Sequence, residues 1–239
     1  MRNIEKVPSA LPRTARWSRL KLLLAAAAVL GASASGVRAH EVDPAVQAHA
    51  QTIAEVDPAV QAHAQTIAIT VCGTCHGTRG NNTVPKFPRL AGQNAHYLAA
   101  QLKAFHAQTR GDPDAVGYMW GMAAELDDAT IEALAAYYAK QKEKPAPAGR
   151  DAALVARGRQ VYEHGVESQG VPACATCHGP DAHGMADFPA LAGQHAQYVL
   201  KQLASFQSNM RNVAVMHGVA QHLQLPEMQA VAAYLEAQP

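Results

Sequence analysis

Cys72-Gly73-Thr74-Cys75-His76 recurs as Cys174-Ala175-Thr176-Cys177-His178, and these two motifs contain all four cysteines of the 239-residue chain. The C-x-x-C-H spacing is the attachment signature of a c-type haem. The two thiols can add to the two vinyl groups of one porphyrin, and the following imidazole can then bind the iron axially. The sequence therefore predicts two covalently bound haem c groups, one on Cys72 and Cys75 and one on Cys174 and Cys177, with His76 and His178 as axial ligands.

The same cysteines allow three other interpretations. A thioredoxin-like C-x-x-C needs a strand-helix-strand context, and no strand pattern surrounds either motif. Two C-x-x-C pairs could bind zinc, but these pairs lie 102 residues apart and a histidine follows each one. A disulfide within each pair would need an oxidising compartment. Two C-x-x-C-H motifs that use every cysteine favour haem.

Residues 1–39 have the pattern of a secretory signal peptide. Four basic residues precede an apolar run from Leu22 to Leu30, and Val37-Arg38-Ala39 is a small-residue cleavage site that would leave His40 as the mature start. Nine apolar residues are too few to span a bilayer. The alternative is an uncleaved N-terminal anchor. An export signal together with two haem motifs predicts location in the bacterial periplasm.

The charge of the mature chain excludes one class of partner. The leader holds seven of the 20 Lys and Arg residues and one of the 19 Asp and Glu residues, so the remainder carries a net charge of −5. A nucleic-acid-binding protein needs a basic surface. The sequence therefore predicts that the protein does not bind nucleic acid.

Two internal repeats divide the chain. Residues 41–54 and 55–68 have the same sequence, EVDPAVQAHAQTIA, which suggests a recent duplication, and the copy nearer Cys72 is expected to form the helix that enters the first haem site. A longer repeat matches residues 87–105 to residues 188–206 at an offset of 101, and residues 126–139 to residues 223–236 at an offset of 97. The expected organisation is a signal peptide (1–39), an N-terminal extension (40–61), a first cytochrome domain (62–143), a Pro/Ala linker (144–150) and a second domain (151–239).

Each domain is expected to contain three main helices and no strands, which makes the fold all-α. In the first, one helix approaches Cys72, one starts near Asn94, and one starts after Asp127, a good N-cap. In the second, Pro226 is expected in the first turn of the last helix. The tyrosines that recur in both halves are expected to pack in the cores; they are Tyr97, Tyr198, Tyr137 and Tyr234.

The longer repeat also selects candidates for the sixth iron ligand. Met119 lies seven residues before Leu126, and Met216 lies seven residues before Leu223. A thioether ligand raises the reduction potential and suits electron transfer. Among the other methionines, Met122 is the main rival, and Met122, Met185, Met210 and Met228 are expected to be packing residues. Bis-histidine ligation is the alternative, with His106, His183, His195, His217 and His222 available.

The prolines after each motif are candidates to accept a hydrogen bond from the iron-binding histidines. A metal-bound imidazole normally donates its second N–H to an acceptor, and the carbonyls of Pro88 and Pro189 follow His76 and His178 at similar spacing. The alternative is that each proline only forms a turn.

Over roughly residues 62–235, the sequence resembles the dihaem cytochrome c4 family. The resemblance depends on both C-x-x-C-H motifs, the two F-P-x-L-A-G-Q segments, Met119-Trp120-Gly121-Met122, the segment 216–220 and the insertion 163–170. It implies two class I cytochrome c domains related by pseudo-twofold symmetry, and iron ligands at His76, Met119, His178 and Met216. The tandem 14-residue repeat departs from the family pattern.

The resemblance implies a carrier that takes electrons from respiratory donors to a terminal oxidase, either soluble or loosely associated with the membrane. The alternative is an electron-accepting cytochrome subunit of a periplasmic dehydrogenase complex. No flavin, nicotinamide or phosphate-binding motif is present, so the chain is not expected to be an enzyme by itself. Peroxidase activity would need an iron without its methionine, and the matched Met119 and Met216 argue against it.

Overall fold

Helices form nearly all of the regular structure. The computed structural model describes residues 57–144 and 151–239, called here the first half and the second half. The expected signal peptide, the first copy of the 14-residue repeat and linker residues 145–150 lie outside the described residues. Within the described ranges, β-structure is limited to two isolated bridges, Val166–Val171 and Met185–Phe188. The predicted all-α fold is confirmed.

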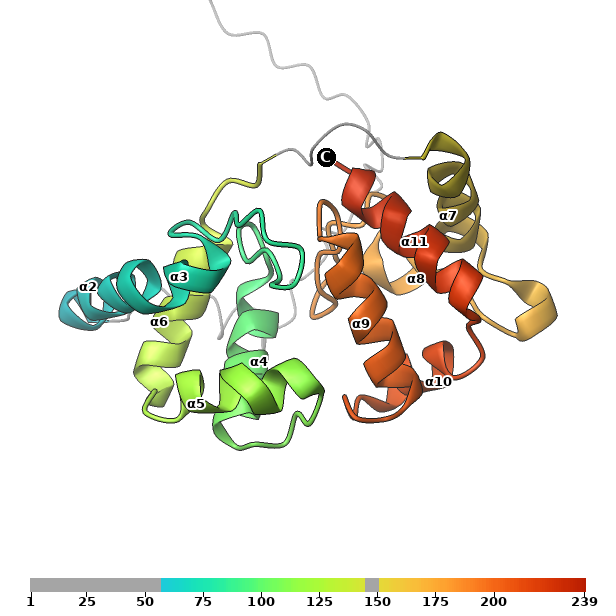
Figure 1. Ribbon diagram of the computed structural model, residues 1–239. Helices are drawn as coiled ribbons and strands as arrows, with labels where there is room; N and C mark the ends of the chain where they lie inside the picture. Colours follow the sequence, from blue (N-terminus) through green and yellow to red (C-terminus); the bar gives the residue numbers. More distant parts are fainter. Residues whose placement is uncertain (1–56, 145–150) are drawn as a thin grey trace, which may run out of the picture. The chain divides into compact units, whose positions relative to one another are not determined.

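The first half begins with the second copy of the 14-residue repeat (Figure 1). Asp57 caps helix α2 by accepting a hydrogen bond from the backbone of Ala59, and Pro58 occupies the first helical position. Helix α2 starts upstream of the boundary expected at residue 62. The elements are α2 (Pro58–Ile67), the π-helical turn η1 (Ala68–Cys72), α3 (Gly73–His76), α4 (Ala95–His106), η2 (Ala115–Met119), α5 (Trp120–Ala123) and α6 (Asp128–Ala139).

The predicted starts of α4 and α6 are confirmed. Asn94 accepts a hydrogen bond from the backbone of Tyr97, and Asp127 accepts one from Thr130. Each cap satisfies an amide that the first helical turn leaves without a partner. Helices α2, α4 and α6 then bury one apolar cluster, which includes Ala64, Ala68, Leu98, Ile131, Leu134 and Tyr138. Cys72 of the first C-x-x-C-H motif packs against this cluster, which fixes the motif in place.

The second half repeats this plan with longer terminal helices. Its elements are α7 (Ala152–His164), the 3₁₀ turn η3 (Glu167–Gln169), α8 (Ala175–His178), α9 (Ala196–Gln207), α10 (Ala214–Ala220) and α11 (Leu225–Ala237). Pro226 lies in the first turn of α11, as predicted. Tyr234, Tyr162, Leu223 and Val231 belong to its main buried cluster.

Helices α7 and α11 cross closely in the second half (Figure 1). Gly158 lies at this crossing, and a Cβ atom added there would overlap the carbonyl group of Ala230. The glycine therefore permits the two backbones to approach, which packs the terminal helices around Tyr162 and Tyr234.

In residues 57–144 and 151–239, no helix has both the length and the apolar character needed to cross a bilayer.

Candidate haem site and interdomain cluster

Both C-x-x-C-H motifs form a short helical turn beside a large cavity. In the first half, Cys72 ends η1, and Cys75 and His76 lie on α3. In the second, Cys177 and His178 lie on α8, with Cys174 at its N-cap. No disulfide joins any of the four cysteines, and both motifs line the cavity. One turn of helix thus presents two thiols and one imidazole together, which is the arrangement that covalent haem attachment requires.

The two histidines have equivalent surroundings. His76 Nδ1 lies 2.9 Å from the carbonyl oxygen of Pro88, and His178 Nδ1 lies 3.0 Å from that of Pro189. Because a carbonyl only accepts, Nδ1 carries the hydrogen, and Nε2 keeps a free lone pair for iron. Burial lowers the pKa of both imidazoles, although the proline carbonyls act in the opposite direction. Both rings are therefore neutral at pH 7.

The predicted sixth ligands line the same cavity. Met119 ends η2 and is partly buried, and Met216 lies on α10. Met122 also lines the cavity, so both candidates from the first half are near the site. Ligation by Met119 and Met216 stays a prediction.

The packing role expected for the remaining methionines is wrong for three of them. Met122, Met185 and Met210 have 55%, 45% and 47% of their surface exposed; Met185 and Met210 lie outside the helices, and Met122 lies on α5 at the cavity. Met228, on α11, is buried in the core as expected.

Three of the histidines considered as alternative ligands have other partners. His106 Nδ1 lies 2.9 Å from the Ala123 carbonyl, and His217 Nδ1 lies 2.8 Å from the Phe206 carbonyl. His195 is buried and contacts Asn82 and Glu236. None of the five lines the cavity, so these histidines do not supply the bis-histidine arrangement.

The cavity encloses about 910 Å³ and is shared by the two halves. Its lining is mostly apolar, with Leu98, Leu102, Val199 and Leu203 among its walls. A porphyrin is a large apolar group, so this lining fits it. The shared cavity means that both haem groups are held in one continuous interior.

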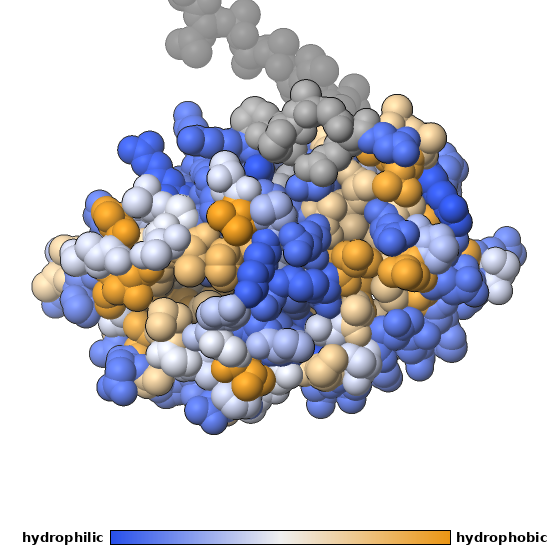
Figure 2. Space-filling model, viewed as in Figure 1, coloured by the Kyte–Doolittle hydropathy of each residue, from blue (hydrophilic) through white to orange (hydrophobic). Residues whose placement is uncertain are grey.

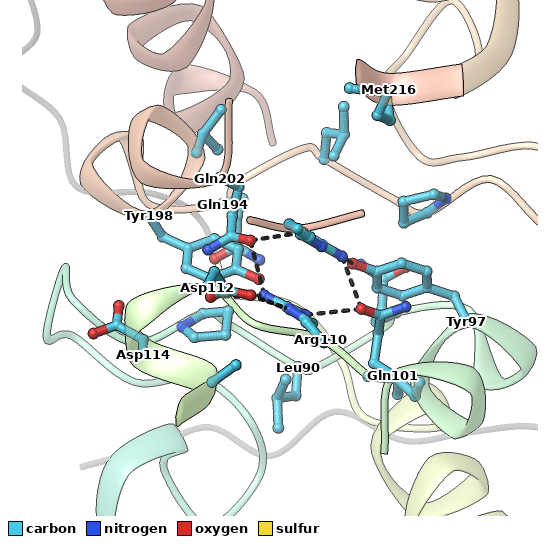
Figure 3. Close-up of a pocket in the computed structure, with 18 of the residues that line it drawn as sticks. Leu90, Tyr97, Gln101, Arg110, Asp112, Asp114, Gln194, Tyr198, Gln202 and Met216 are labelled. Carbon is cyan, nitrogen blue, oxygen red and sulfur yellow. Dashed lines mark hydrogen bonds and ion pairs between the residues drawn. The ribbon is translucent and has the colours of Figure 1, made fainter. Parts of the chain in front are cut away.

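A polar cluster from both halves lies at the centre of this cavity (Figure 3). Gln101 Oε1 accepts from Arg110 Nη1 and from Arg211 Nη2, each at 2.8 Å. Gln202 Oε1 accepts from Arg110 Nη2 and from Arg211 Nη1, also at 2.8 Å. Each glutamine of one half thus bridges both guanidinium groups, and we call these four residues the interdomain cluster.

One acidic residue joins the interdomain cluster. Asp112 is 1% exposed, and its Oδ1 accepts from Arg110 Nε at 2.5 Å. Burial alone would raise the pKa of Asp112, but the hydrogen bond and charge of Arg110 hold it below its usual value. The equivalent position of the second half is Val213. Two buried cations therefore face one buried anion.

The remaining positive charge fits a carboxylate-bearing cofactor. Arg211 Nε is buried and has no hydrogen-bond partner, and a buried donor without a partner is costly. Haem carries propionate carboxylates, which arginine binds well. The four cysteines and two histidines would hold the porphyrins, and Arg211 would take a carboxylate group.

The prediction that Tyr97 and Tyr198 pack in the cores is wrong. Both line the cavity, and the Tyr97 hydroxyl accepts a hydrogen bond from Arg211 Nη2 at 2.7 Å. Tyr137 and Tyr234 do pack with their cores, as predicted.

A second set of reciprocal contacts joins the halves beside the cavity. The Gln93 side chain accepts from the Ala190 amide at 2.9 Å and donates to its carbonyl at 2.8 Å. Gln194 makes the same pair of bonds to Arg89, at 2.8 and 3.0 Å. Each glutamine side chain thus pairs with both the backbone N–H and the backbone C=O of one residue in the opposite half.

The sequence analysis missed these contacts although it contained their signal. Gln93, Gln101 and Arg110 have partners at the same offset of 101 residues, namely Gln194, Gln202 and Arg211. Polar residues retained at a fixed offset in both halves indicate a shared role, and here that role is at the boundary between the halves.

The alternative chemistries for the cysteines find no support in the geometry. The four thiols form no disulfide. Across the described parts of the chain, no three His, Cys, Asp or Glu side chains group as a metal site.

Comparison with known proteins agrees with this site. The cytochrome c family model matches residues 61–142 and again 155–238. Cytochrome c4 of Stutzerimonas stutzeri is 40% identical over 179 residues, covering 70% of this chain and 84% of the relative. The solved cytochrome c4 of Acidithiobacillus ferrooxidans is 40% identical, with a TM-score of 0.66 over 70% of this chain and 97% of that one.

A further relative has a different role in its name. The thiosulfate dehydrogenase electron acceptor of Thiomonas intermedia is 41% identical over 175 residues, covering 70% of this chain and 78% of the relative. Two matches to one domain family, two attachment motifs and the cytochrome c4 relatives identify the class of protein. The chain belongs to the dihaem cytochrome c4 family, as an electron carrier rather than an enzyme, with one covalently bound haem c in each of its two cytochrome c domains.

Proposed function

We propose that this cytochrome carries electrons in the periplasm from respiratory donors to a terminal oxidase. Haem iron supplies one-electron oxidation and reduction. The observation that carries the proposal is the shared cavity, because both haem attachment motifs line one continuous interior. One half can therefore face a donor while the other faces an acceptor.

Each half also has an apolar rim where its cavity meets solvent. Val116, Tyr118 and Met122 form the rim of the first half, and Phe188, Val213 and Val215 form that of the second. Figure 2 shows hydrophobic side chains gathered on one face of both halves, with hydrophilic side chains between them. Exposed apolar patches of this kind mark interaction sites, and they suit brief contact with redox partners.

The charges at and around these rims are expected to set the rate of encounter. Residues 40–143 carry a net charge of −4 and residues 144–239 carry −1. Lys86 lies at the first rim, with its Nζ 4.3 Å from the centre of the Tyr118 ring. Electrostatics of this kind mostly changes association rates, so the two halves are expected to prefer different partners.

Stopped-flow mixing of the reduced protein with a periplasm-facing terminal oxidase tests the main proposal. Rapid oxidation that slows with added salt supports it. Lys86→Gln should change the association rate at low salt, whereas Lys140→Gln, exposed at the end of α6, serves as a matched control. Failure to reduce any oxidase tested would contradict it.

The second candidate is an electron-accepting subunit of a periplasmic dehydrogenase complex. The relative named as a thiosulfate dehydrogenase electron acceptor favours it. Copurification with a dehydrogenase, together with faster reduction by that enzyme than oxidation by any oxidase, would select this candidate.

Location is tested separately, because protein recovered from the periplasmic fraction should begin at His40.

A further inference from the structure

The two histidine–proline contacts differ in one respect. The Pro88 carbonyl accepts from His76 Nδ1 at 2.9 Å and also from the Asn82 side-chain amide at 2.9 Å. In the described second half, Pro189 accepts only from His178. The first iron ligand therefore shares its acceptor with a second donor, and the other does not.

Asn82 is held from the second half. His195 Nε2 lies 3.2 Å from both the backbone and the side-chain oxygen of Asn82. His195 Nδ1 lies 3.3 Å from Glu236 Oε1. Asn82, His195 and Glu236 are 7%, 3% and 4% exposed. A buried chain of hydrogen bonds thus runs from His76 through Pro88, Asn82 and His195 to Glu236.

The donors in this chain have one consistent assignment. The Asn82 amide donates to the carbonyls of Phe87 and Pro88, so its oxygen faces His195. His195 Nε2 must then carry a hydrogen. On the other side of the ring, His195 Nδ1 faces Glu236 Oε1 at 3.3 Å. The pair polarises Asn82 and strengthens its donation to Pro88.

We propose that Asn82 and His195 are positioning residues that raise the reduction potential of the haem in the first half, and of that haem alone. A carbonyl that accepts two hydrogen bonds is a weaker acceptor for either donor. His76 therefore keeps more of its Nδ1 proton and is a less electron-rich ligand, which favours the reduced iron. The haem in the second half has no such control, so the chain gives two similar haem sites different potentials.

The test is a spectroelectrochemical titration of the holoprotein, with NMR of the haem methyl groups to assign each potential to its half. Asn82→Asp keeps an acceptor for His195 but removes the donor to Pro88. It should lower the potential of the first haem and leave the second unchanged. His183→Ala, exposed on the loop after the second motif, is the control and should change neither potential.

A second variant keeps the proposal testable if Asn82→Asp fails to fold. His195→Gln keeps a donor near Asn82 but removes the contact with Glu236, and it should lower the first potential by less than Asn82→Asp does. The ring protons of His76 should shift in the same NMR spectra. Equal shifts of both potentials, no shift in either variant, or an increase of the first potential would overturn the proposal.

Discussion

Arg110 and Arg211 each bond to the glutamine of the opposite half, with Arg110 Nη2 2.8 Å from Gln202 Oε1 and Arg211 Nη2 2.8 Å from Gln101 Oε1. Each guanidinium also stacks over a phenylalanine of its own half, Phe105 or Phe206, with the central carbon 4.7 and 4.5 Å from the ring centre. The two arginines are therefore fixed by both halves, and the residues at the boundary between the halves also line the haem cavity.

Gln194→Ala should weaken the coupling between the halves. The substitution leaves the Arg89 amide and carbonyl without their partner, which should cost about 1–3 kcal/mol. In calorimetry the two halves should then unfold more independently of one another, as two separate thermal transitions. Gln197→Ala, exposed in the first turn of α9 three residues later, should leave the melting profile unchanged. A single unshifted transition for Gln194→Ala would contradict the role given to this contact.

Met119→Ala and Met216→Ala should each remove about half of the weak long-wavelength absorption of methionine-bound ferric haem. Both methionines line the cavity, and each lies seven residues before the matching leucine, Leu126 or Leu223. Loss of a thioether ligand removes this band. Met122→Ala is the control for the first half. If Met122→Ala removes the band while Met119→Ala retains it, the ligand of the first half is Met122.

Gly158→Ala should destabilise the second half. The added Cβ overlaps the Ala230 carbonyl, and overpacking of this kind costs about 1–3 kcal/mol. Denaturation monitored by the haem absorption of each half should show the loss in the second half first. Gly218→Ala on α10 is the control, because a Cβ there meets no atom within 4 Å.

Deletion of one 14-residue copy should leave haem content and thermal stability nearly unchanged. The copies are identical, so removing either gives the same polypeptide, which retains the residues that form α2 and bury Ala64 and Ala68. Removing both copies is the control, and it should destabilise the first half because α2 is lost. A large effect of the single deletion would show that both copies contribute.

Asp112→Asn should lower stability at neutral pH but not in acid. The folded-state pKa of Asp112 lies below its usual value, so its stabilisation is present above the unfolded value of about 4 and is lost as the pH falls through the folded value. Urea unfolding should show a deficit of about 2 kcal/mol at pH 7. That deficit should shrink below about pH 4. A deficit independent of pH would mean that the charge of Asp112 is not responsible.

Local signals in the sequence predicted the helices and attachment motifs well. Asp127 and Asn94 cap their own helices, so their role depends only on nearby residues. Tyr97 was predicted to pack in its core because helical spacing gives the face of a residue but not its partner. Its hydroxyl instead bonds to Arg211, more than 100 residues away. Contacts across the boundary of the halves needed the structure.

The same limit applies to Asn82. It lies near His76 in sequence, but its partner His195 belongs to the other half, and the repeat matches it to no asparagine in the second half. The internal repeat finds what the halves share. It cannot identify residues that occur in one half only, such as Asn82 and Asp112.

The reciprocal bonds of Gln93 and Gln194 are the kind that a symmetric dimer makes, in which the same surface patch occurs on both subunits. In a homodimer every substitution appears twice, so neither subunit could acquire Asp112 without its copy acquiring the same charge. Joining the copies in one chain removes that constraint. Within one chain, the reciprocal contacts between the halves can therefore be kept while the residues around the two redox centres differ.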